Sequence, residues 1–146
     1  MIAENVADLI DRVKSVSALT ASASIFLGGH GTDPALLKIP LPAAWVRYEQ
    51  DSPDEAPYST SSGAGPAIVP ASQVCLAMCS VIIYVPYVSE SDLLTTQYPL
   101  LEQVIAAIHG KDAPSGHRWR YFGQKIALVA NDRMAYQQRY TLDMVL

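Results

Sequence analysis

A nearly unbroken apolar run, Val74–Val85, dominates the hydrophobic pattern of the chain. Its β-branched and aromatic residues favour a long buried strand, and the run is shorter than the roughly 20 apolar residues that a membrane span needs. Pro86 should end the strand, because proline has no N–H to donate. The run therefore predicts the central strand of the fold.

An amphipathic helix should follow this strand. Ser89–Asp92 supplies capping and acidic residues suited to a helix N-terminus, and Gly110 is suited to a position just after its end. The residues spaced to form one apolar face are Leu94, Leu101, Val104, Ile105 and Ile108.

Periodicity predicts three elements before the central strand. Residues 2–17 show helical spacing, with Asp8 and Arg12 forming an opposite-charge pair one turn apart. Residues 22–27 are typical of a short strand. Residues 43–50 alternate as a strand does, with Trp45, Arg47 and Glu49 on one face.

Two strands should complete the chain. Residues 118–123 alternate charged and aromatic side chains, and residues 124–130 are more uniformly apolar. Asn131-Asp132 is a suitable two-residue hairpin turn. Residues 135–146 then alternate as a half-buried antiparallel strand does, with Tyr136, Tyr140, Leu142, Met144 and Leu146 on the apolar face.

The order of elements predicts an α+β fold: a mostly antiparallel β-sheet with two α-helices packed on one face. Residues 1–146 should form a single domain. Residues 51–72, rich in Pro, Ser and Gly, form either a disordered insertion or an arm of a long β-hairpin that orders against a partner.

Composition points towards assembly. Half of the residues are hydrophobic, only 16% are charged, and the net charge is −4. So few charges on a small chain indicate that part of its surface is covered by other subunits. The chain lacks the basic footprint of a nucleic-acid-binding domain, and its N-terminus lacks the positive region of a signal peptide, so we expect it in a cytoplasm.

Catalytic signals are weak. Gly28-Gly29-His30-Gly31 lacks the Lys-Ser/Thr and the helix of a phosphate-binding loop, which favours a tight turn. His30, His109 and His117 have no metal-ligand spacing, and His109 falls in the last turn of the predicted helix. Cys75 and Cys79 lie about 13 Å apart along a strand of roughly 3.3 Å per residue, too far for a disulfide. We therefore expect no catalytic site, no metal and no cofactor.

Four arginines near the C-terminus leave three interpretations open. Arg118, Arg120, Arg133 and Arg139 lie among aromatic residues. They could form an RNA-binding strand, a solvated sheet edge or a subunit interface, where arginine and aromatic residues are enriched.

Several local patterns and their order resemble one family. They are Val6-Ala7-Asp8-Leu9-Ile10, the approach Leu41-Pro42-Ala43-Ala44-Trp45-Val46, the arm at 51–72, the helix Leu100–Gly110, and the ending Arg120–Gly123 with Asn131–Tyr140. Over most of its length the chain resembles the tail terminator (tail completion) proteins of long-tailed bacteriophages, including those of Mu-like phages.

The resemblance implies a virion structural protein rather than an enzyme. Such a protein would form a hexameric ring that caps the tail tube, stops its polymerisation and joins the tail to the head. Its partners would be further copies of itself, the tail tube protein, a head-completion or neck protein, and a sheath protein if the tail is contractile. Genomic DNA would pass through the lumen without specific binding, and no membrane would be involved. The chain would be assembled in the host bacterial cytoplasm and reside at the head-proximal end of the tail.

Interface contacts should then come from the arm and the C-terminal arginines: Asp51, Asp54, Glu55, Tyr58, Arg118, Arg120, Arg133 and Arg139. Two alternatives remain. One is another neck or tail-tube component of a phage particle. The other, of a different class, is a small enzyme or ligand-binding domain that uses the glycine loop around His30.

Overall fold

The computed structural model describes residues 2–20, 23–25, 41–53, 74–130 and 132–145. The glycine loop around His30 and residues 54–72 of the predicted arm lie outside these residues.

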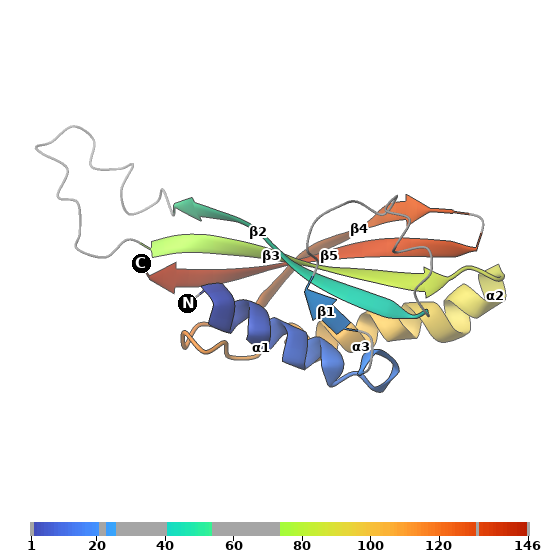
Figure 1. Ribbon diagram of the computed structural model, residues 1–146, viewed down its shortest axis with the longest axis horizontal. Helices are drawn as coiled ribbons and strands as arrows, with labels where there is room; N and C mark the ends of the chain where they lie inside the picture. The colour runs from blue at the N-terminus through green and yellow to red at the C-terminus, as the bar shows by residue number, and fades with distance from the viewer. Residues whose placement is uncertain (1, 21–22, 26–40, 54–73, 131, 146) are drawn as a thin grey trace, which may run out of the picture.

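The described strands form one sheet, in the order β1-β2-β3-β5-β4. The strands are β1 (Ala23–Ile25), β2 (Ala43–Pro53), β3 (Val74–Pro86), β4 (Arg120–Val129) and β5 (Arg133–Val145). β2, β3, β5 and β4 are mutually antiparallel, and β1 pairs in parallel with β2. Both helices lie on one face of this sheet (Figure 1). The α+β fold class predicted from the sequence is therefore confirmed.

Strand boundaries follow the sequence closely in the first hairpin. β3 begins at Val74 and ends at Pro86, as the apolar run and the proline predict. β2 extends beyond its predicted end at residue 50 to Pro53, because its ladder with β3 continues to the pair Pro53–Cys75. Asp51, predicted to start the loop, thus lies opposite Ala77 within the ladder.

β5 corrects one prediction. The sequence predicted a half-buried strand, whereas its residues 133–138 are buried on both faces of the sheet. The reason is position: β5 lies between β3 and β4 and under α3, so Gln137 donates to Ser80 of the neighbouring strand and Gln138 donates to the Leu101 carbonyl of α3. β4 forms one edge of the described sheet and β1 the other, and Ile126 and Val129 of β4 are exposed.

The N-terminal helix α1 (Ile2–Lys14) ends earlier than predicted. A turn and a short 3₁₀ helix, η1 (Ser17–Leu19), follow it and bury Val16 and Leu19 against the sheet. The predicted pair of Asp8 and Arg12 is present at 2.9 Å.

The second helix is continuous from Glu90 to Ile108, but its register differs from the predicted one. α2 (Glu90–Asp92) is capped by the Ser89 hydroxyl, which accepts a hydrogen bond from the Asp92 N–H. A π-helical segment, η4 (Leu93–Gln97), leads into α3 (Tyr98–Ile108). The wider π turn places Leu93 in the core and leaves Leu94 66% exposed, so the prediction that Leu94 faces the core is wrong.

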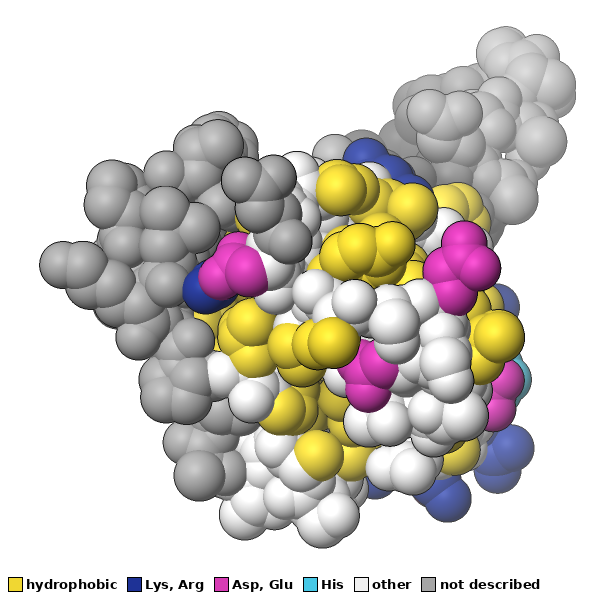
Figure 2. All heavy atoms as spheres, turned by 90° about the vertical axis from the view of Figure 1, so that its right-hand side faces the viewer, with side chains coloured by type: hydrophobic (Ala, Val, Ile, Leu, Met, Phe, Trp, Pro, Cys, Tyr) yellow, Lys and Arg dark blue, Asp and Glu magenta, His cyan; other side chains and the backbone are white. Residues whose placement is uncertain are grey.

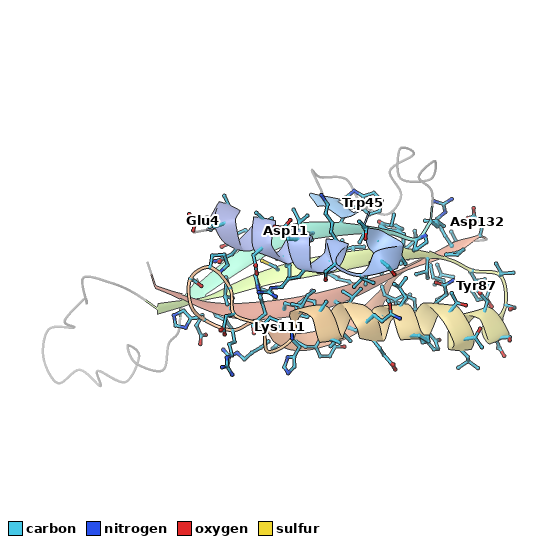
Figure 3. The ribbon with its side chains drawn as sticks, turned by 90° about the horizontal axis from the view of Figure 1, so that it is seen from below. Glu4, Asp11, Trp45, Tyr87, Lys111 and Asp132 are labelled. Carbon is cyan, nitrogen blue, oxygen red and sulfur yellow. The ribbon has the colours of Figure 1, made fainter. Side chains whose placement is uncertain are left out.

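The main core lies between the helices and the sheet. Leu9 and Val13 of α1 and Val104 and Ile108 of α3 pack on the alternating residues of the strands that point towards them. Seen from the helix side, α1 and α3 lie side by side across the sheet (Figure 3). Each fully buried aliphatic side chain of this kind contributes roughly 1.5–3 kcal/mol.

The two ends of the molecule differ. α1 begins and β5 ends at one end, which is also where β2 ends and β3 begins. The opposite end carries α2 and the turn between β4 and β5 (Figure 1). The sheet face away from the helices carries a second, smaller hydrophobic cluster, in which Trp45, Ile82 and Tyr84 are buried.

Candidate functional site

The first candidate surface is the outer face of the sheet, which we define as the side chains that point away from α1 and α3. Strand register places Arg47, Ser80 and Arg139 in one row across β2, β3 and β5, and this row ends at Gly123 of β4. The neighbouring row brings Trp45, Ile82, Gln137 and Lys125 together. Polar and charged groups from all four antiparallel strands therefore meet in the middle of this face.

Glu49 is the centre of this polar cluster. Its side chain is only 11% exposed, and its carboxylate lies 3.6 Å from Nη2 of Arg47 and 3.6 Å from Nε of Arg139. Nε2 of Gln137 donates to Glu49 Oε1 at 2.6 Å and to Ser80 Oγ at 2.8 Å. A buried carboxylate needs such partners, because an isolated charge away from water is costly. The carboxylate of Glu49 thus lies between the two arginines on the outer face.

The predicted interface arginines do not form one site. Arg120 pairs with Asp143 at 2.9 Å and shares the outer face with Arg139. Arg118 lies on the loop before β4 and pairs with the exposed Asp112 at 3.1 Å. Arg133 lies six residues before Arg139 on β5, about 20 Å away at roughly 3.3 Å per residue, and forms hydrogen bonds with Asp132.

The acidic half of the predicted interface is largely outside the described residues. Asp51 belongs to β2, whereas Asp54, Glu55 and Tyr58 are not described.

Asp132 and Arg133 form a local pair at the turn between β4 and β5. Hydrogen bonds from Arg133 lower the pKa of the Asp132 carboxyl. The carboxylate stays exposed, so the pair leaves an acidic group on the surface at this end of the molecule.

The second candidate surface is a groove of about 630 Å³ at that same end, which we call the end groove. It lies between the start of the second helix and the β4–β5 hairpin, and it is lined by Tyr87, Glu90, Leu93, Leu94, Tyr98, Val129, Ala130 and Met134. Figure 2 faces this end and shows hydrophobic side chains spread over it, with acidic side chains among them. In Figure 3, Tyr87 and Asp132 lie at this end, beside the start of the helix.

Two residues that were considered as candidate catalytic groups, His109 and Cys79, lie within the described residues. Nδ1 of His109 accepts a hydrogen bond from the Tyr121 N–H at 3.0 Å, which ties the end of α3 to β4. Cys79 is buried in the core between the helices and the sheet.

Among the residues that the structure describes, no group of three or more His, Cys, Asp or Glu side chains is arranged to hold a metal ion. None of the helices described has the length and apolar character needed to cross a membrane.

Sequence reasoning missed the roles of Glu49, Gln137 and the end groove. The alternation at 43–49 and at 135–146 placed Arg47 with Glu49, and Gln137 with Arg139, on shared strand faces. Neither pattern reveals that β3 brings the two strands into one sheet with these residues in adjacent rows. The groove depends on a π turn, which no pattern of residues along the chain indicates.

Comparison with known proteins gives one informative result. No family model and no curated protein matches the chain. A solved chain from the virion of a native gene transfer agent (GTA) particle has the same fold, with a TM-score of 0.63 and 10% sequence identity. The match covers 99% of this chain and 97% of that chain. At this identity, the similarity establishes a shared fold over nearly the whole length.

Proposed function

We propose that this chain is a structural protein of a virion and acts as its tail terminator. The observation that carries the proposal is the nearly full-length fold shared with a chain of the gene transfer agent virion. The sequence patterns that resemble tail terminators support the more specific role. The outer face could also contribute to binding, because the side chains of Arg120 and Arg139 remain partly exposed there.

The mechanism is geometric. Six copies would close into a ring through heterologous contacts, in which two different patches of the subunit meet. One side of the ring would cap the tail tube and stop its polymerisation, and the other would bind a head-completion or neck protein. A sheath protein would be a further partner if the tail is contractile. The net charge of −4 suits a lumen through which DNA passes without specific binding.

Interface residues are proposed from the arm and from the outer face. Arg120 and Arg139 are the best placed arginines, because both lie on the outer face and remain partly exposed. Arg118 would contribute from the loop before β4. Arg133 is 7% exposed, so it would act by holding Asp132 at the surface. The acidic and aromatic contributions would come from Asp51, Asp54, Glu55 and Tyr58.

A second candidate within the same class is another neck or tail-tube component. The shared fold supports this role as well, since the matched structure is named only as a virion. The two roles differ in stoichiometry: a terminator occupies one ring per tail, whereas a tube protein repeats along it.

The mass of the purified chain in solution tests the proposal. Native mass spectrometry should find a closed assembly of six subunits, either alone or after addition of tail tubes. A chain that stays monomeric under both conditions would exclude the ring. The variant His30→Ala serves as a control, because ring assembly does not require the glycine loop, whereas a ligand-binding domain built on that loop would lose its function.

Deletion of residues 54–68 tests the arm. The fold should survive, because the β2–β3 ladder is described up to Pro53 and from Val74 without this segment, but assembly should be impaired. An unfolded deletion variant would show that these residues are part of the folded domain instead.

A further inference from the structure

The rim of the end groove carries exposed apolar side chains that do not contribute to the hydrophobic core. Leu94 and Val129 at its rim are each 66% exposed, and Val88 on the loop before α2 is 76% exposed. Single exposed apolar residues are normal on protein surfaces, whereas a contiguous group around a groove indicates a binding site.

The backbone at the groove supports this interpretation independently. The π-helical turn Leu93–Gln97 forms one wall, and such turns are rare and occur often at functional sites. The turn is held by a specific contact, because Nε2 of the buried Gln97 donates to Oδ2 of Asp92 at 3.0 Å. Because of this π turn, two consecutive leucines line the groove, with Leu93 at the base and Leu94 at the rim.

Both walls of the groove are fixed to one another. The Tyr87 N–H donates to the Asp132 carbonyl at 3.0 Å, which links the loop after β3 to the β4–β5 turn. The ring of Tyr98 packs edge-on against Tyr136, with ring centroids 6.3 Å apart. A preformed groove of this kind loses little conformational entropy when a ligand binds.

Charge defines the chemistry of the ligand. Glu90 lines the groove and is exposed, Asp92 lies two residues further on, and Asp132 closes the turn. Arg133 is the basic residue beside these acidic side chains, and its guanidinium donates hydrogen bonds to the Asp132 carboxylate. An apolar groove with an acidic rim is complementary to aliphatic side chains that lie beside lysine or arginine.

Strand β4 defines the conformation of the ligand. It forms one of the two edges of the described sheet, and its Ile126 and Val129 point to the same side of the sheet as the groove. An edge strand offers unpaired N–H and C=O groups to an extended peptide, and the side chains of such a peptide alternate between two faces.

We propose that the end groove and the adjacent edge of β4 bind an extended segment of another protein in which aliphatic and basic residues alternate. This inference goes beyond the proposed function and holds whether or not the chain closes into a ring. A second copy of this chain fits less well. Its segment Arg118–Tyr121 alternates basic and aromatic residues, but Trp119 is buried in its own core and Arg120 is paired with Asp143.

A synthetic peptide of alternating leucine and lysine serves as the probe. Methyl NMR of the whole chain should show saturable shifts at Leu94, Val129 and Met134. A peptide with glutamate in place of lysine, and one with serine in place of leucine, should each bind roughly tenfold or more weakly. Equal binding of the glutamate peptide, or shifts that lie elsewhere on the protein, would overturn the proposal.

Variants of the rim separate the groove from other acidic surfaces. Leu94→Gln combined with Val129→Thr should weaken binding of the leucine–lysine peptide roughly tenfold, and Glu90→Lys should weaken it several-fold. Both changes are at exposed positions, so the fold should persist, as circular dichroism would verify. The control Glu102→Lys, on the exposed side of α3, should leave binding unchanged.

Self-association of the same variants tests the competing occupant. Sedimentation velocity of the Leu94→Gln/Val129→Thr chain should give the same distribution of assemblies as the unmodified chain. Loss of self-association in this variant would assign the groove to a second copy and overturn the proposal.

Discussion

The indole Nε1 of Trp119 donates a hydrogen bond of 2.9 Å to Oδ2 of Asp8, across a sequence separation of 111 residues. The same carboxylate oxygen accepts from Nε of Arg12 at 2.9 Å, and Nη2 of Arg12 reaches the Asp112 carbonyl at 2.6 Å. These contacts join α1 to the loop that leads into β4. They make the N-terminal helix a fixed part of the domain, although it is far in sequence from the strand that it meets.

Replacing Asp8 by alanine should destabilise the protein. The Trp119 indole is fully buried, so its N–H would lose its partner at a cost of about 1–3 kcal/mol. Urea unfolding followed by tryptophan fluorescence measures this change. Asp11→Ala is the matched control, because Asp11 is an exposed acidic residue of the same helix (Figure 3) and its loss should change stability by less than about 0.5 kcal/mol. Equal effects of the two changes would contradict a specific role for the Asp8–Trp119 contact.

Replacing Glu49 by leucine should disrupt the outer face. Arg47 and Arg139 would lose their shared carboxylate, and the Gln137 amide would lose one acceptor, which should cost roughly 1–3 kcal/mol. Glu49→Gln should cost less, since the amide oxygen still accepts from Gln137. Thermal unfolding of both variants measures the difference. Glu102→Gln on α3 is the control, and a loss of stability in that variant of the same size as in Glu49→Leu would refute the role of the cluster.

The neighbouring leucines 93 and 94 test the π turn. Leu93→Ala removes a buried side chain and should cost about 2–5 kcal/mol, whereas Leu94→Ala should change stability by less than about 0.5 kcal/mol. Guanidinium unfolding of both variants provides the comparison. If Leu94→Ala were the more destabilising change, the helix would instead have the register that the sequence predicts.

Tyrosine ionisation should weaken the fold at alkaline pH. Burial raises the pKa of Tyr136 to about 12, with Tyr98 adding to the shift, and burial also raises the pKa of Tyr140. An unfolded tyrosine ionises near pH 10, so the unfolded chain releases these protons first. The free energy of unfolding should therefore be unaffected by these groups below about pH 10, and should fall as pH rises from about 10 to 12.

Urea midpoints measured across this pH range check the tyrosine prediction. Tyr140→Phe should lower stability at neutral pH, because the Tyr140 hydroxyl donates to Gln138 at 2.7 Å, but should make the alkaline decline shallower. Tyr87→Phe, at an exposed position, should leave the decline unchanged. A decline of the same steepness in Tyr140→Phe and in the unmodified chain would show that this group does not carry the effect.

Local sequence patterns predicted most of the fold because the relevant signals are short-range. The apolar run ending at Pro86 and the cap at Ser89 depend on neighbours along the chain, and both appear where expected. The burial of β5 depends on which strands flank it. Alternation at 135–146 cannot distinguish a central strand, whose polar residues form hydrogen bonds within the protein, from a strand that faces solvent.

The candidate surfaces were less predictable, since each joins distant segments. Glu49 depends on the register of β2, β3 and β5, and the end groove depends on one wide turn in a helix. The predicted arginines share a sequence region, but strand geometry separates Arg133 from Arg139 along β5. The four arginines that lie close together in the sequence therefore do not form one cluster in the folded protein.

Immunogold labelling of particles from cells that make this chain tests the central claim most directly. An antibody against the chain should label the purified particles at one position, the head-proximal end of the tail. Label distributed along the whole tail would assign the chain to the tube. Particles that carry no label, while the chain remains in the soluble fraction, would contradict its role as a virion structural protein.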